Sequence, residues 1–243
     1  MSRVIIANPF ITNMIRMKKT IIFSLMVILG FGAFAQPAAE STMKKISVGY
    51  DLYTSIFLDM PTGIKTRTIN QGANVFLMYN HMLSDNGFSF AGGLGISSEN
   101  LYLKNAFIPN IKADSISFVN VPLGVKVTRS KLNVTYFDIP LEVRYVTAKK
   151  MRFTLGMKFG FLIDSKTMFK GDAIDQEGNK LGYGTQVKYK NVNQLESVRY
   201  GVQARIGWKW VHVYGYYSLN KLFKADKGPQ MYPISVGITF MPF

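Results

Sequence analysis

The chain has 243 residues, of which 48% are hydrophobic and 18% charged, a composition that fits a single folded domain. It contains no cysteine, which excludes a disulfide framework, a thiolate nucleophile, a cysteine-ligated zinc site and a lipid-anchoring cysteine. The formal net charge is +15. Its basic residues are spread along alternating segments and do not gather on one face, which argues against nucleic acid as a partner.

The N-terminal segment has the pattern of a secretory signal peptide. A Met-Lys-Lys sequence at 17–19 opens it, an apolar run over 20–32 follows, and an A-x-A sequence ends at Ala35. The apolar run is short for a bilayer and has no basic stop-transfer residues after it. We therefore expect a signal peptide over 17–35 that is cleaved before Gln36.

After the signal peptide, apolar and polar side chains alternate with a period of two residues, which indicates β-strands. In 151–164 the odd positions are large and apolar while the even positions are mostly polar or small. The segments 198–210 and 137–145 repeat this alternation. Together with weaker cases, the pattern predicts eight strands, at 46–53, 73–80, 88–96, 137–145, 151–164, 198–210, 211–219 and 232–240.

Two positions disturb the alternation around the fourth strand. The apolar phase slips at Tyr136 and Phe137, which predicts a β-bulge. Pro140 has no amide proton, so we expect a bulge or a weakened hydrogen-bond ladder there.

The connections between the predicted strands alternate between short and long. The tight turns lie at 84–87, 148–150 and 208–211, and the long loops cover 61–68, 100–130, 165–191 and 220–231. An even strand number with short turns on one rim and long loops on the other is typical of outer-membrane barrels, whose turns are periplasmic. The polar face carries glycines beside cations, which suits a narrow lumen, and the large aromatic face suits lipid.

The predicted fold class is therefore all-β, an eight-stranded antiparallel up-and-down transmembrane β-barrel in the outer membrane of a Gram-negative bacterium. A secreted, lipocalin-like barrel shows the same alternation with the apolar face inward and remains the alternative. The expected organisation is an upstream extension over 1–16, a signal peptide over 17–35, a periplasmic lead over 36–43 and the barrel over 44–243. Met17 is the alternative start of the chain.

Two segments resemble a known family. The segment 137–145, Phe-Asp-Ile-Pro-Leu-Glu-Val-Arg-Tyr, resembles a strand of the PorT-like outer-membrane β-barrel family of Bacteroidetes. The segment 234–243 resembles the last strand of that family, although Pro242 intervenes and Phe243 is out of phase. The resemblance implies a barrel whose last strand is recognised by the barrel-assembly machinery. It implies no catalytic residues in this chain. One family member is an accessory factor in type IX secretion, so the resemblance also implies a role in protein secretion.

Charged side chains of both signs fall on the expected lumen face. A narrow barrel needs polar filler, and opposite charges shielded from bulk water satisfy one another, so we interpret them as a structural network. An ion path or a proton relay is the other interpretation. The residues are Asp51, Asp138, Glu142, Arg144, Arg152, Lys158, Asp164, Arg199 and Arg205.

The sequence offers little for catalysis. Barrel enzymes place their reactive groups at the outer rim, whereas His81 and His212 both fall near the predicted periplasmic rim. We expect no catalytic residue, cofactor or metal. The lysines of loops 100–130 and 165–191 fit solvated surfaces better than a ligand site, although anionic sugars or a partner would suit their charge. Aromatic girdles are predicted from Trp208, Trp210, Tyr214, Tyr216, Tyr217 and Tyr232.

The sequence thus predicts a non-enzymatic outer-membrane barrel with a structural or accessory role. Its expected partners are outer-membrane lipids, the barrel-assembly machinery during insertion, and a protein bound through loops or periplasmic turns. The alternatives are a small-solute pore or transporter and an enzyme acting on outer-membrane lipid. Eight strands argue against the first, because their side chains fill so narrow a lumen.

Overall fold

The computed structural model describes residues 45–83, 86–122, 124–174 and 180–241. The predicted extension, signal peptide and periplasmic lead, together with Pro242 and Phe243, lie outside the described residues. None of the described residues forms a helix long and apolar enough to cross a membrane.

The described part of the chain contains eleven strands. They are β1 (Ile46–Leu58), β2 (Gln71–Met82), β3 (Phe88–Leu103), β4 (Ala106–Phe107), β5 (Val119–Asn120), β6 (Val127–Val146), β7 (Met151–Ile174), β8 (Lys180–Lys190), β9 (Val198–Trp208), β10 (Val211–Ser218) and β11 (Tyr232–Phe240).

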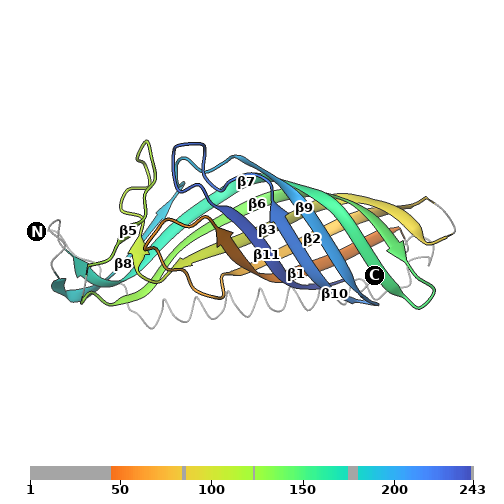
Figure 1. Cartoon of the computed structure of the whole chain (residues 1–243), viewed down its shortest axis with the longest axis horizontal. Helices are drawn as coiled ribbons and strands as arrows, with labels where there is room; N and C mark the ends of the chain where they lie inside the picture. Colours follow the sequence, from red (N-terminus) through yellow and green to blue (C-terminus); the bar gives the residue numbers. More distant parts are fainter. Residues whose placement is uncertain (1–44, 84–85, 123, 175–179, 242–243) are drawn as a thin grey trace, which may run out of the picture. The chain divides into compact units, whose positions relative to one another are not determined.

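Eight of these strands form a closed antiparallel ring (Figure 1). The order is β6-β3-β2-β1-β11-β10-β9-β7, and the pairing of β6 with β7 closes the ring. Closure matters in a membrane, because an unpaired strand edge leaves peptide groups without partners in hydrocarbon. All eight ring strands were predicted, so the eight-stranded antiparallel barrel is confirmed.

On one side of the barrel, the strands are longer than the sequence predicted. The first part of β7 pairs with β9 through Phe161, and the second part pairs with β8 from Lys166 onward. The strand β8 and the upper parts of β3, β6 and β7 occupy segments that were predicted to be loops, within 100–130 and 165–191. The prediction relied on an apolar outer face, whereas the outer face of these extensions is largely polar and charged.

The two faces of the wall follow the predicted alternation. Leu155 is 62% exposed and faces outward, whereas its neighbour Thr154 is 5% exposed and faces the interior. The outward side chains of the ring form an apolar belt, as a lipid-facing surface requires. Trp208, Trp210 and Tyr217 lie on this outer face.

The girdle prediction is wrong for Tyr214 and Tyr216, which are buried inside the barrel. In β10 the even positions face inward and the odd positions outward. Tyrosines occur on both faces of this strand, so the alternation alone did not reveal which of them are internal.

The predicted bulge exists, but the extra residue lies on the partner strand. Thr135 pairs with Asp164 and Tyr136 pairs with Leu162, so Ile163 of β7 is the inserted residue. In β6 the buried positions alternate without a break through this region. The apparent phase slip in the sequence arises because the inward side chains of β6 change from apolar to polar between Tyr136 and Asp138.

The weakened ladder expected at Pro140 is confirmed. Between β3 and β6, Gly92 pairs with Leu141 and Gly95 with Asp138, and the register has no pairs between them. Pro140 lies in this gap and still pairs with Lys158 of β7 on its other side.

Candidate functional site

The candidate site is the interior of the barrel, which contains a balanced set of buried charges. Seven of the nine residues predicted for the lumen network are at most 4% exposed. With the unpredicted Glu99, the described residues place four carboxylates and four cations in the interior. They are Asp51, Glu99, Asp138, Glu142, Arg144, Lys158, Arg199 and Arg205.

Arg205 of β9 links two carboxylates from opposite sides of the barrel. Its Nη2 lies 3.0 Å from Oδ2 of Asp51, and its Nη1 forms an ion pair with Glu142. Its Nε donates to Oγ1 of Thr239 at 3.0 Å, and that hydroxyl donates to Asp51 at 2.6 Å. Glu142 also pairs with Arg144 at 2.7 Å. These contacts join β1, β6, β9 and β11 across the lumen.

Arg199 anchors a second group nearer the long-loop end. Its Nη2 lies 3.0 and 2.9 Å from the two carboxylate oxygens of Asp138, and its Nη1 lies 3.4 Å from Glu99. Lys158 shares Asp138 at 3.9 Å and donates to the hydroxyl of Tyr214 at 2.9 Å. Asp138 therefore balances two buried cations.

Buried tyrosine rings enclose these cations. The Nζ of Lys158 lies 4.1 Å from the ring centroid of Tyr216, and the guanidinium carbon of Arg199 lies 4.0 Å from that of Tyr136. The guanidinium carbon of Arg205 lies 4.9 Å from the ring of Tyr214. Such contacts stabilise a desolvated cation by up to about 2 kcal/mol. The rings fill space that water or a solute would otherwise occupy.

An apolar cluster fills the barrel above the charged groups. It includes Leu132, Val134 and Tyr136 of β6 together with loop residues from three connections between strands. From the loops, Ile111 and Ile116, Val192 and Leu195, and Leu222, Phe223 and Met231 are all at most 7% exposed. We call this cluster the apolar plug. It closes the long-loop end of the interior.

Two predicted network members lie outside this fully buried set. Arg152 is only partly buried, close to the short-turn rim, where its Nη1 lies 2.9 Å from the sulfur of Met241. The placement of Asp164 in the lumen is wrong, because its partly exposed side chain pairs with the exposed Lys166. The inserted Ile163 reverses the alternation of β7, so the side chain of Asp164 turns outward.

The prediction also missed several members of the interior network. Glu99 lies in the part of β3 beyond the predicted end at 96. Ser97 faces the interior, and extending the two-residue alternation of β3 beyond it would have placed Glu99 inside as well. Gln203 donates to Glu142 at 2.8 Å, and Asn74 donates to Asp51 at 2.8 Å. Both had the correct phase for the lumen face but were not counted, because only charged residues were considered.

The two histidines do not form a common site. His81 is exposed on the outer face of β2, whereas His212 is 1% exposed inside the barrel, and both lie toward the short-turn rim. Neither ring nitrogen of His212 has a hydrogen-bond partner among the described residues. The described residues also contain no group of three acidic or histidine side chains suited to a metal ion.

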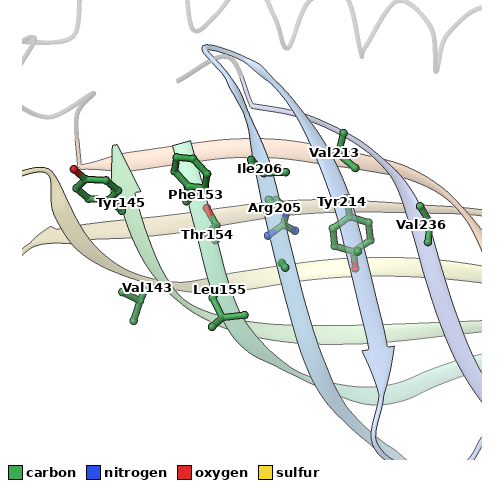
Figure 2. A pocket seen from close by; sticks show the side chains of 12 residues that line it. Val143, Tyr145, Phe153, Thr154, Leu155, Arg205, Ile206, Val213, Tyr214 and Val236 are labelled. Carbon is green, nitrogen blue, oxygen red and sulfur yellow. The ribbon is translucent and has the colours of Figure 1, made fainter. Parts of the chain in front are cut away.

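The outer wall carries a hollow over β6, β7, β9, β10 and β11 (Figure 2). Its floor includes Ala204 and Gly215, which are cross-strand partners, and a Cβ added at Gly215 would meet no atom within 4 Å. Larger apolar side chains, among them Leu155, Ile206 and Val236, surround these small residues. The lining of the hollow is mainly apolar, which suits hydrocarbon.

Comparison with known proteins gives one family and distant structural likenesses. The family model described as "Outer membrane protein beta-barrel domain" matches residues 34–224. No curated protein matches the sequence. One similar solved structure is that of the attachment invasion locus protein Ail of Yersinia pestis in complex with the heparin analogue sucrose octasulfate. Its sequence is 12% identical to this chain, the TM-score is 0.36, and the match covers 81% of this chain and 97% of Ail. A mutant porin of Rhodopseudomonas blastica is 11% identical with a TM-score of 0.21, over 81% of this chain and 99% of the porin. With TM-scores this low, neither likeness supports an argument about function.

Proposed function

Since the chain belongs to the outer membrane protein β-barrel domain family, we propose that it is a closed, non-enzymatic barrel of the outer membrane with a structural or accessory role. The filled interior is the observation that carries this proposal. The charged side chains pair across the lumen, the tyrosine rings enclose the cations, and the apolar plug covers them. A solute would have to break several buried ion pairs to pass.

Protein secretion is the process that we propose for this role. The support is the resemblance of 137–145 and 234–243 to the PorT-like family, together with a closed wall that carries exposed segments at the long-loop end. Tyr183 of β8 is 61% exposed there, and Lys149 is exposed in the turn at the opposite rim. Either end offers a surface to a protein partner, whereas the interior does not.

Planar-bilayer recording tests whether the barrel is closed. We expect the purified, folded protein to give no steady conductance, under conditions in which a porin gives its open-channel current. Folding is checked by faster migration on SDS gels before heating than after. Reproducible channel openings from heat-modifiable protein would contradict the proposal and favour the small-solute pore.

Photo-crosslinking in living cells tests the accessory role. A photoreactive amino acid at Tyr183 or at Lys149 would report partners at the two rims separately. We expect a protein crosslink from one of these positions and a change in the secreted proteins when the gene is deleted. Crosslinks to lipid alone, with unchanged secretion, would contradict this role.

A further inference from the structure

A group of basic side chains lies on the outer face of the extended wall, directly above the apolar belt. We name it the cationic patch, and we propose that it binds the phosphate groups of the outer-leaflet glycolipid, the lipid A part of lipopolysaccharide. Its members are Arg67, Arg129, Lys131, Lys166, Lys170, Lys188 and Lys190, and all except the partly buried Lys131 are exposed.

The upper edge of the apolar belt is sharp on this side. Ile96 of β3 pairs with Phe137 of β6, and Phe137 pairs with Phe161 of β7, so one apolar row crosses three strands. In the next outward row, Ser98 pairs with Thr135, and Thr135 pairs with Asp164. The change from apolar to polar side chains over one row places the membrane interface here.

Cations occupy the rows above this edge. In one row Lys166 pairs across strands with Lys190, and in the next row Lys131 pairs with Met168, whose other partner is Lys188. Above them Arg129 pairs with Lys170. Directly paired residues have Cα atoms about 5 Å apart, so these charges lie within reach of one another. Like charges opposite each other are destabilising without an anion between them.

Lys131 holds the centre of the cationic patch in place. Its Nζ donates to Oδ1 of Asn100 at 2.8 Å and lies 5.5 Å from the ring centroid of Tyr102. The guanidinium carbon of Arg67 lies 4.9 Å from the same centroid. Burial, together with the positive charges of Arg129, Lys166 and Lys188, lowers the pKa of Lys131.

The charge balance of the cationic patch differs from that of the interior. Four carboxylates match four cations inside the barrel, but among the described residues the patch has seven cations and two outward carboxylates. Asp164 pairs with Lys166, and Asp172 accepts a hydrogen bond from the backbone amide of Lys126. This excess of positive charge favours the binding of anions from outside the protein. A phosphate group, with several acceptor oxygens, can bridge two neighbouring cations.

The position of the cationic patch favours a lipid phosphate as the anion. In outer-membrane barrels the long loops are extracellular, so the cationic patch lies at the level of the lipid headgroups of the outer leaflet. Lipid A carries phosphates on sugars joined directly to acyl chains. Its acyl chains would contact the apolar belt while its phosphates contact the patch, whereas free phosphate gains no such apolar contact. This inference requires only the outer-membrane location and is independent of whether the barrel conducts or assists secretion.

Binding of labelled, bisphosphorylated lipid A to the full barrel in non-ionic detergent tests the proposal. The variant K131Q/K166Q/K188Q removes three charges from the cationic patch, and K149Q/K150Q/K209Q removes three exposed lysine charges at the short-turn rim. With about fivefold for each charge near a membrane surface, we expect the patch variant to bind about 100-fold more weakly. The rim variant should bind as the unchanged protein does.

Dephosphorylated lipid A and inorganic phosphate identify the ligand group. We expect lipid A without phosphates to bind the unchanged protein as weakly as intact lipid A binds the patch variant. Inorganic phosphate at millimolar concentration should not displace lipid A. Equal binding by the patch and rim variants, undiminished binding of dephosphorylated lipid A, or displacement by inorganic phosphate would each overturn the proposal. Heat-modifiable migration of every variant confirms that a loss of binding is not a loss of folding.

Discussion

Replacing Asp138 by asparagine is the sharpest perturbation of the barrel interior. Asp138 is 1% exposed and balances both Arg199 and Lys158. Among the described residues, D138N leaves Arg199 with one carboxylate, Glu99 at 3.4 Å, and leaves Lys158 with none within 4.0 Å. The asparagine preserves the shape of the side chain, so the loss isolates charge from packing.

The expected loss in the free energy of unfolding is about 3–5 kcal/mol, the usual effect of removing one partner from a buried ion pair. The control is D164N, which makes the same chemical change in the partly exposed pair with Lys166. That variant should lose at most about 1 kcal/mol, because water screens an exposed pair.

Urea unfolding from lipid vesicles measures both variants. The chain contains two tryptophans, Trp208 and Trp210, and both are exposed near the short-turn rim, so their fluorescence reports the transfer of the barrel between lipid and water. A second variant, D138N/K158M, removes the unbalanced cation and should recover part of the loss. If D138N and D164N lost the same stability, or if D138N/K158M were no more stable than D138N, the charge argument would be refuted.

Two further predictions use the same unfolding assay. G156A should lose about 1–3 kcal/mol, because its Cβ would clash with the backbone carbonyl oxygen of Leu141, whereas G215A should keep its stability because no atom lies within 4 Å of its added Cβ. Equal stabilities of the two variants would disprove the steric reasoning. Y216L should lose about 1–2 kcal/mol with the contact to Lys158, whereas Y216F should stay within about 0.5 kcal/mol, since the Tyr216 hydroxyl has no hydrogen-bond partner among the described residues. A larger loss in Y216F than in Y216L would show that the ring is not the stabilising group.

The ring of strands could be predicted because lipid imposes a simple pattern on the chain. Outward positions within the apolar belt must be apolar, and inward positions of a narrow lumen are polar or small, as in 151–162 and 198–206. This contrast identified all eight ring strands and seven of the nine network residues. It also set the correct phase for Arg199 and Arg205, because their neighbours in sequence are large and apolar.

The pattern failed where this contrast ends. Above the apolar belt, water lies outside the wall and the apolar plug lies inside, so inward Leu132 and Val134 follow the opposite rule. The upper parts of β6 and β7 therefore looked like loops, and Glu99 escaped notice. Tyr214 and Tyr216 were misplaced for a related reason, because aromatic rings next to buried cations resemble interfacial aromatics in a sequence. Only the three-dimensional proximity of Lys158 and Arg199 distinguishes the two environments.

The bulge at Ile163 determines on which side of the wall the lysines above it in β7 lie. In a regular β-strand, successive side chains point to opposite faces, so a shift of one residue exchanges the two faces. If Ile163 took a place in the regular alternation instead of forming the bulge, Lys166 and Lys170 would point into the interior, and Ser165 and Thr167 would point outward. The same sequence can therefore form a sealed interior or a charged exterior, according to whether one residue below it bulges out of the ladder. In barrels of this architecture, the gain or loss of one bulge is a direct route between a surface that holds lipid and a lumen that carries charge.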